Sequence, residues 1–232
     1  MGEIGPKLER HLLGISELSC EQISYYLETA QTFLEVGSRA VKKVPALRGR
    51  TIINLFASDS LHTRVSFEIA ANRLSADAVS VSNLTYKEEL YDAISKLECM
   101  GPDVLVIRHA TSGFVCKIAE KIRNVSVINA GDGDNQHPTQ ALIDALTVKK
   151  AKGRISDLVI AYVGRSSNNR VFTSNSQLFR MFNCEQRLIV PSVKNLGTNV
   201  GEDIQISDSL EVGLKNADVI ILLNGNQTDM SV

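Results

Sequence analysis

The chain has 232 residues, of which 44% are hydrophobic and 22% are charged, and its formal net charge is −1. This composition is typical of a folded protein with a substantial core and excludes a disordered or fibrous chain. The near-neutral charge offers no overall field for nucleic acid or for an anionic membrane surface. No apolar run approaches the roughly 20 residues that cross a bilayer. We therefore expect neither a nucleic-acid partner nor a membrane.

The four cysteines, Cys20, Cys99, Cys116 and Cys184, are widely spaced and lack the close spacing of metal ligands. A chain of this size does not need disulfides for stability, and its N-terminal stretch lacks the apolar segment of a secretory signal. We therefore expect reduced thiols, no bound metal and a cytoplasmic location.

Helical and strand-like patterns alternate along the chain. Ser19 followed by Gln22 has the spacing of a capping box and predicts the start of the first helix. Short apolar runs such as TIINLF at residues 51–56 predict buried strands. The predicted helices cover residues 19–44, 63–74, 87–99, 114–123 and 138–152, and the predicted strands cover residues 51–56, 78–81, 104–108 and 125–130.

A second alternating series follows. We predict strands at residues 158–163, 187–190 and 217–223 and a helix at residues 170–182. Apolar strands that alternate with helices indicate parallel sheets covered on both faces. We therefore predict an α/β fold with two doubly wound domains, residues 1–152 and 153–232. The second domain is expected to be incomplete, because it has few strands and the sequence stops soon after one.

Polar segments follow three of the strands in the first series, where ligands bind in open α/β sheets. They are residues 57–64 (ASDSLHTR), Arg108 with His109, and residues 131–140 (GDGDNQHPTQ). A helix N-terminus with hydroxyls and a cation suits a phosphate group. The alternatives are an ordinary capped helix, a surface arginine in an ion pair and a structural histidine. Because the fold brings the three segments together, we favour a binding site for an anion.

These motifs resemble the aspartate/ornithine carbamoyltransferase family. Residues 60–68 (SLHTRVSFE) are similar to its phosphate motif, and residues 137–140 (HPTQ) match its His-Pro-x-Gln motif. The following residues 141–147 (ALIDALT) are closer to the aspartate branch, as are HLLG at 11–14 and LRGR at 47–50. Residues 169–171 (NRV) resemble the Ser-Arg-Val segment of the family's second domain.

The resemblance implies the reaction of carbamoyl phosphate with L-aspartate, an early step of pyrimidine synthesis, without a cofactor. It also implies an active site shared between subunits, and hence a homotrimer or an assembly with a homologous or partner subunit. By resemblance, Thr63, Arg108 and His137 are catalytic; carbamoyl phosphate is bound by Ser60, His62, Thr63, Arg108, His137 and Gln140; and aspartate is bound by Lys87, Arg170 and Asn224. Arg64 is expected to be structural, paired with a carboxylate.

Several residues depart from the family pattern. His62 stands where the family's phosphate motif has an arginine, and Asn224 stands where an arginine binds the second aspartate carboxylate. The loop before Lys87 is short, and Glu89 adds a carboxylate there. Losing one charge-assisted contact is expected to raise the barrier by about 3–4 kcal/mol. The sequence also stops at Val232, before the family's last elements, which is expected to leave apolar surface uncovered.

These departures leave more than one function open. The chain is expected to be an aspartate carbamoyltransferase-like protein with impaired activity, or a non-catalytic homologue that binds carbamoyl phosphate or a partner and supports a complex. A carbamoyltransferase with another amine acceptor and an unrelated α/β binding domain are two further alternatives.

Overall fold

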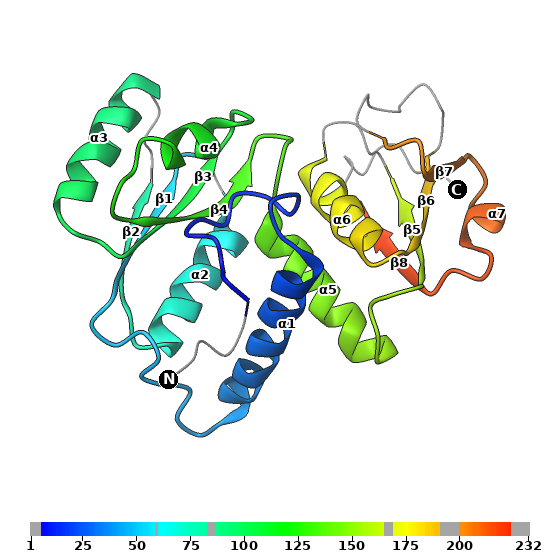
Figure 1. The fold of residues 1–232 in the computed structure, drawn as a ribbon, viewed down its shortest axis with the longest axis horizontal. Coiled ribbons are helices and arrows are strands. Elements are labelled where there is room, and N and C mark those ends of the chain that lie inside the picture. The colour runs from blue at the N-terminus through cyan, green and yellow to red at the C-terminus, as the bar shows by residue number, and fades with distance from the viewer. Residues whose placement is uncertain (1–5, 59, 83–86, 165–168, 191–199, 224–232) are drawn as a thin grey trace.

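Two four-stranded parallel sheets, each flanked by helices, make up the protein (Figure 1). The computed structural model describes residues 6–58, 60–82, 87–164, 169–190 and 200–223, with the side chains of residues 82 and 87–90 left aside. The α/β fold predicted from the sequence is confirmed, and the second unit is the shorter one. No helix within the described residues is long and apolar enough to cross a membrane.

The first sheet has the strand order β2-β1-β3-β4. Alternate residues of its strands pack on opposite faces, so Ile53 and Leu55 lie in one core cluster and Ile52 and Phe56 in another. Helices α3 and α4 cover the first of these faces, and α2 covers the second. The elements are β1 (Thr51–Phe56), α2 (Leu61–Arg73), β2 (Asp77–Ser82), α3 (Lys87–Cys99), β3 (Val104–His109), α4 (Phe114–Ala119) and β4 (Ser126–Asp132).

The second sheet has the strand order β7-β6-β5-β8, again parallel throughout. Helix α6 covers one face, where Tyr162 of β5 packs edge-on against Phe172 with ring centroids 5.0 Å apart. The short helix α7 packs on the other face. The elements are β5 (Val159–Val163), α6 (Arg170–Met181), β6 (Glu185–Ile189), β7 (Ile204–Ser207), α7 (Leu210–Leu214) and β8 (Val219–Leu222).

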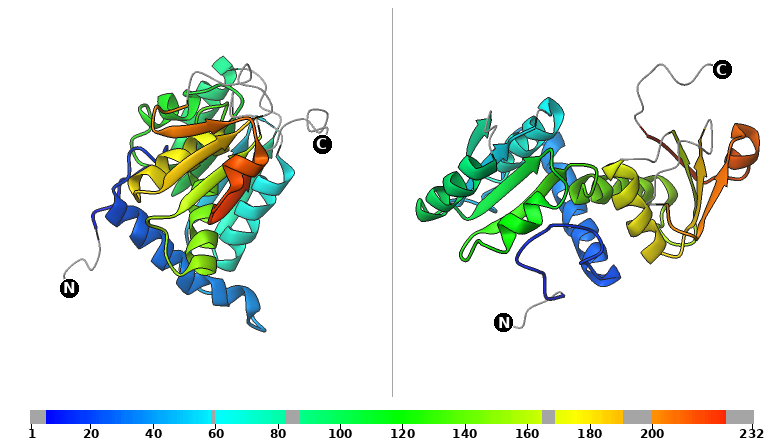
Figure 2. Two further views of the ribbon diagram at one scale, coloured as in Figure 1. Left: turned by 90° about the vertical axis from the view of Figure 1, so that its right-hand side faces the viewer. Right: turned by 90° about the horizontal axis from the view of Figure 1, so that it is seen from above.

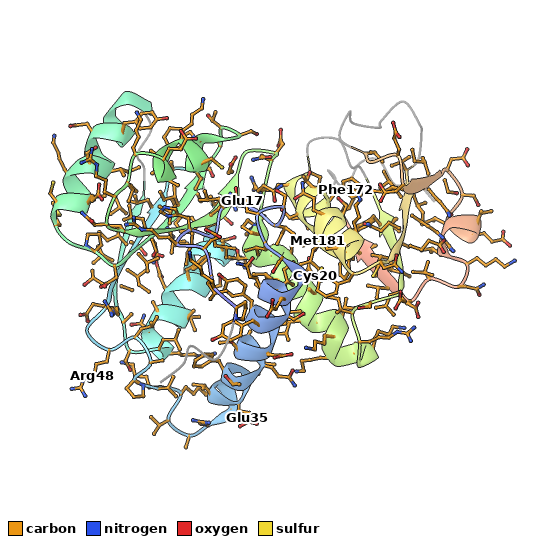
Figure 3. All side chains as sticks on the ribbon, viewed as in Figure 1. Glu17, Cys20, Glu35, Arg48, Phe172 and Met181 are labelled. Carbon is orange, nitrogen blue, oxygen red and sulfur yellow. The ribbon has the colours of Figure 1, made fainter. Side chains whose placement is uncertain are left out.

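Three helices lie between the two sheets: α1 (Cys20–Leu34), α5 (Pro138–Lys152) and α6 (Figure 2). Their apolar residues join the second sheet in one core cluster, which includes Ile23 of α1, Ala145 of α5 and Phe179 of α6. In addition, the Cys20 thiol donates to the Met181 carbonyl oxygen at 3.2 Å (Figure 3). This shared core fixes α6, which belongs to the second unit, against α5 of the first.

Most predicted elements are confirmed within one or two residues, but two predicted helices need correction and two elements were missed. The helix predicted for residues 19–44 begins with the expected Ser19–Gln22 capping box, yet it ends at Leu34 and continues only as a 3-10 helix, Glu35–Ser38. A β-branched valine and a glycine in that turn disfavour the α-helix. The helix predicted for residues 114–123 ends at Ala119. The strand β7 and the helix α7 were not predicted at all.

The predicted domain boundary falls between α5 and β5, at residues 152 and 153. The two sheets are separate, but α1 and α5 contribute to the core of the second one. The boundary therefore stays a prediction about which parts fold as units.

Candidate functional site

The carboxyl ends of the first sheet's parallel strands lie at one edge, as the sequence analysis required. The segments after β1, β3 and β4 lead respectively into α2, α4 and α5. The site is built from the start of α2, the end of β3 and the loop 131–137 that precedes α5. Helix α6 of the second unit completes it, because Arg170 and Ser174 contact that loop.

At the start of α2, the N-cap Ser60 does not cap the helix with its side chain. Its hydroxyl donates instead to the Thr63 hydroxyl at 2.9 Å. The first backbone N–H groups of α2 are therefore not engaged by this cap and suit an anion, which the helix dipole also favours. Arg64 lies 4.0 Å from the Glu68 carboxylate, in line with the structural role predicted for it.

Arg108, at the end of β3, is 6% exposed. Its Nη1 donates to the Ala130 carbonyl oxygen at 2.9 Å, which holds the guanidinium against β4. A Cβ atom added to Gly131 would lie 2.6 Å from Arg108 Nη1 and 3.4 Å from Arg170 Nε. Only a glycine, with its φ of +121°, lets both guanidinium groups approach the backbone here.

Arg170 is the first residue of α6 and reaches across to the first unit. Asn169 caps this helix by accepting from the Val171 and Phe172 amides at 3.0 and 3.1 Å. Arg170 Nη1 then donates to the Gly133 carbonyl oxygen at 2.5 Å. Burial lowers the pKa of Arg170 from its usual value, and the carboxylates of Asp134 and Asp132 partly oppose that shift.

His137 is the N-cap residue of α5 and is 7% exposed. Burial, followed by the positive charges of Arg108 and Arg170, lowers its pKa to about 3. The imidazole is therefore neutral at physiological pH. Its Nδ1 lies 3.4 Å from the Thr139 hydroxyl. In the tautomer in which Nδ1 accepts from Thr139, Nε2 carries the proton and acts as a hydrogen-bond donor.

The backbone of His137 is also fixed from the second unit. Its amide donates to the Ser174 hydroxyl at 2.8 Å, and that hydroxyl donates to Gln136 Oε1, also at 2.8 Å. Gln136 Nε2 in turn donates to Gln177 at 3.0 Å. This buried polar chain joins the loop before α5 to α6 and sets the position of the histidine relative to Arg170.

Two pockets open at this junction. The α2–α5 pocket has a volume of about 430 Å³, and the α6–β8 pocket has a volume of about 520 Å³. Gln140 lines both of them. The α2–α5 pocket is lined by His62, Thr63, Ser66, Phe67, Ala70, His137, Thr139, Gln140, Leu142 and Ile143. The α6–β8 pocket is lined by Gly133, Asp134, Gln140, Asp144, Asn169, Arg170, Val171, Ile221, Leu222 and Leu223.

Most of the residues selected from the sequence meet at these pockets. His62, Thr63, His137 and Gln140 line the α2–α5 pocket, and Ser60 contacts Thr63. Arg108 and Arg170 both act on the pKa of His137, and Arg170 lines the α6–β8 pocket. The side chain of Lys87 and the whole of Asn224 lie outside the described residues.

The sequence analysis gave no role to Asp134 or Asp144, which line the α6–β8 pocket. Asp144 carried a usable signal, since it follows Gln140 by four residues on a predicted helix and such residues share a face. Asp134 lies in the glycine-rich loop that was singled out, but nothing in the sequence pointed its carboxylate towards Arg170. Among the described residues, no group of three or more His, Cys, Asp or Glu side chains could hold a metal ion.

The fold and the site define a two-unit α/β protein with a polar pocket between its units, lined by Arg170 among other residues. The family model described as the carbamoyl-P binding domain of aspartate/ornithine carbamoyltransferase matches residues 10–150. The chain therefore belongs to the aspartate/ornithine carbamoyltransferase family.

Among its relatives is the aspartate carbamoyltransferase catalytic subunit of Syntrophotalea carbinolica, which is 41% identical. The match covers 94% of this chain and 71% of the length of that subunit. The corresponding subunit of Sorangium cellulosum is 42% identical over 96% of this chain and 70% of its own. The chain thus spans about seven tenths of the length of these relatives.

Two solved structures have the same fold. The catalytic subunit of M. jannaschii aspartate transcarbamoylase matches with a TM-score of 0.83 and 29% identity, over 92% of this chain and 73% of its own. The Trypanosoma cruzi aspartate transcarbamoylase, solved with carbamoyl aspartate and phosphate, matches with a TM-score of 0.80 and 25% identity, over 91% of this chain. The match covers 74% of the T. cruzi chain.

Proposed function

We propose that this protein transfers the carbamoyl group of carbamoyl phosphate to L-aspartate, giving N-carbamoyl-L-aspartate and phosphate, a step of de novo pyrimidine biosynthesis. The observation that carries the proposal is the position of Gln140 on the wall shared by two pockets, beside a neutral His137. One pocket suits the group that is transferred, and the other suits its acceptor. The relatives and the T. cruzi complex with carbamoyl aspartate and phosphate support the choice of substrates.

Carbamoyl phosphate is proposed to bind with its phosphate at the start of α2. The backbone N–H groups there, the hydroxyls of Ser60 and Thr63, and the His62 ring supply donors, and Arg108 supplies a fixed positive charge. These are the groups that phosphates prefer, namely helix N-termini and planar guanidinium donors. The Thr63 and His62 side chains line the same pocket as His137, which supports a binding mode with the carbamoyl end towards α5.

The carbamoyl carbonyl oxygen is proposed to accept hydrogen bonds from Thr63, Arg108 and His137. Negative charge grows on this oxygen when the acceptor amine attacks the carbonyl carbon, and preorganised donors stabilise it. The new C–N bond forms as the bond between the carbonyl carbon and the bridging oxygen breaks, and the proton that the neutral amine loses passes to the departing phosphate. A neutral His137 with a protonated Nε2 can donate to the oxygen without adding a further positive charge beside two arginines.

Arg170 is proposed to bind one carboxylate of L-aspartate in the α6–β8 pocket, with Lys87 and Asn224 as further contacts. Helix α3, which begins with Lys87, lies on the opposite side of the first unit from α6 (Figure 1). This separation supports a site that receives Lys87 from a neighbouring copy. Because the resemblance to the family implies an active site shared between subunits, we propose a homotrimer, with an assembly with a homologous or partner subunit as the alternative. Sedimentation of the purified protein tests the assembly, and a monomer at micromolar concentration would contradict it.

Turnover is proposed to be slower than in an ordinary member of the family. His62 lines the α2–α5 pocket where the family's motif has an arginine, and an imidazole offers fewer donors than a guanidinium. The same observation favours a second candidate function, a non-catalytic homologue that binds carbamoyl phosphate and supports a complex.

A colorimetric assay for carbamoyl aspartate, combined with calorimetry of phosphate binding, separates these functions. Formation of carbamoyl aspartate that needs much more aspartate in an Arg170→Ala variant is expected for the enzyme. Phosphate binding without any turnover would favour the non-catalytic homologue. Folded protein that neither binds phosphate nor forms product would contradict both.

A further inference from the structure

The carboxylate of Asp144 accepts hydrogen bonds from both units of the protein. Its Oδ1 accepts from Gln140 Nε2 at 2.9 Å, and its Oδ2 accepts from Asn175 Nδ2 at 2.7 Å. Gln140 and Asp144 share one face of α5, whereas Asn175 lies on α6 and is completely buried. Asp144 therefore links the residue shared by the two pockets to the helix that begins with Arg170.

The contact with Asp144 decides which end of the Gln140 amide is available to a ligand. A carboxylate only accepts hydrogen bonds, so it holds the amide nitrogen and leaves Oε1 as the free end. Gln140 lines both pockets, and its Oε1 can therefore accept an N–H from a group bound there. If the amide oxygen and nitrogen exchanged places, the NH₂ group would point towards such an N–H, and two donors would face each other.

We propose that Asp144 is a positioning residue that fixes the Gln140 amide with its oxygen towards the carbamoyl amine. The inference rests on the proposed function, because it assigns the group that Gln140 recognises. It adds a specificity to that function. The pocket should prefer a phosphonate with a terminal amide, whose NH₂ donates to Oε1, over one with a terminal carboxylate, which Oε1 would repel.

Asn175 determines which variants are informative. Its Oδ1 is buried and has no hydrogen-bond partner among the described residues. A rotation that exchanges the amide oxygen and nitrogen of Asn175 would therefore break no hydrogen bond of that oxygen. In an Asp144→Asn variant, the new Oδ1 can still accept from Gln140, and a reoriented Asn175 can accept from the new Nδ2. Asp144→Ala removes both acceptors and releases Gln140.

The test is calorimetry with three probes: inorganic phosphate, phosphonoacetamide and phosphonoacetate. The wild type is expected to bind the amide better than the carboxylate. In Asp144→Ala the ratio of these two affinities should fall about tenfold, which corresponds to 1.4 kcal/mol. Phosphate affinity should change by less than about threefold, or 0.7 kcal/mol. Asp144→Asn should keep the wild-type ratio.

Asp157→Asn is the matched control, because the Asp157 carboxylate also accepts from an asparagine amide, that of Asn183 at 2.8 Å, but on the surface. It should leave all three affinities unchanged. An equal loss for all three probes in Asp144→Ala would overturn the inference in favour of a merely structural role. An unchanged ratio would overturn it too. A wild type that binds no phosphate would instead sink the proposed function, and this inference with it.

Discussion

The two pockets differ in how their charges are arranged. Among the described residues that line the α2–α5 pocket there is no carboxylate, and its polar groups are hydroxyls, imidazoles and an amide. The α6–β8 pocket has Arg170 as its described cation, together with the carboxylates of Asp134 and Asp144. The first pocket therefore sets no negative charge of its own against a dianion, whereas the second sets one cation against two carboxylates and can neutralise at most one negative charge with these residues.

This difference suggests that the two substrates are selected in different ways. On the proposed assignment, phosphate would be bound by backbone donors and a buried arginine, which the fold itself places at the ends of strands. The acceptor side depends on one arginine carried in from the second unit and on carboxylates that compete for it. A substitution in one pocket should change ligand binding there and leave binding in the other pocket unchanged.

The largest effect is expected at His137. Removing the ring in His137→Ala should lower kcat about 10²–10³-fold, the usual cost of losing one donor to a developing oxyanion. Phosphate affinity should change little, because the ring is assigned to the carbonyl oxygen. His137→Gln, whose amide can donate to the same oxygen, should retain more activity. A kcat for His137→Ala within tenfold of the wild type would contradict the assignment.

His137 also predicts how stability depends on pH. The pKa of this histidine is about 3 in the folded protein, compared with about 6.5 when the chain is unfolded. Below pH 6.5 the unfolded chain binds a proton that the folded one does not, so acidification towards pH 3 should destabilise the fold. Denaturant unfolding should show a shallower loss over this range in His137→Gln than in the wild type. Parallel curves would indicate that the ring is not buried as neutral imidazole.

A smaller effect is expected at Arg170, and it should fall on aspartate binding rather than on phosphate binding. Arg170→Ala should weaken aspartate binding by about 1.5–3 kcal/mol, roughly a tenfold to hundredfold rise in KM, because a hydrogen bond to a charged group is lost. Phosphate affinity, measured by calorimetry, should stay close to that of the wild type. Arg170→Lys keeps the charge without the forked geometry, so its KM for aspartate should lie between those of the wild type and Arg170→Ala. A parallel loss of phosphate binding would mean that the two pockets are not separate.

On the phosphate side, His62→Arg should strengthen binding. A guanidinium offers a planar set of donors to the phosphate, and one added hydrogen bond to a charged group is worth about 1–3 kcal/mol. Calorimetry with inorganic phosphate should therefore show an increase of about tenfold, with KM for aspartate unchanged. No gain in phosphate affinity would show that the start of α2 does not face the phosphate.

The sequence pointed more directly to the residues of the proposed phosphate side than to those of the proposed acceptor side, for a physical reason. Thr63 and His137 follow strands β1 and β4, Arg108 lies at the end of β3, and the strands of one parallel sheet end at a common edge. Their meeting therefore follows from local patterns. Arg170 was placed only through the resemblance to a family, because its position depends on how α6 packs on α5. Long-range packing of this kind leaves no local pattern in the sequence.

The same limit explains other residues and elements that were missed. The bond between Asp144 and Asn175 joins positions 31 residues apart on two helices. Strand β7 is an edge strand of four residues, Ile204–Ser207, two of which are exposed, and so it lacked the continuous apolar run of a buried strand. The fold class followed from patterns that repeat many times, whereas these details depend on single contacts.

The smallest effect is expected at Asp134, the exposed carboxylate beside Arg170. An anionic acceptor that approaches Arg170 has to share that guanidinium with Asp134. Removing the negative charge in Asp134→Asn keeps the size of the side chain and should strengthen aspartate binding. Because the group is exposed, the gain should be only about 0.2–1 kcal/mol, or up to about fivefold in KM. Phosphate affinity is expected to change less, since Asp134 does not line the α2–α5 pocket.

Two features of this change separate it from an indirect effect. The gain should shrink as salt is added, because mobile ions screen exposed charges over about 10 Å at 0.1 M ionic strength. The matched control is Asp208→Asn, which removes an exposed carboxylate that lines neither pocket and should leave KM unchanged. If Asp134→Asn raises KM for aspartate, the carboxylate assists the acceptor, for example by attracting its ammonium group. The contrast between a phosphate pocket free of carboxylates and an acceptor pocket weakened by them would then have to be abandoned.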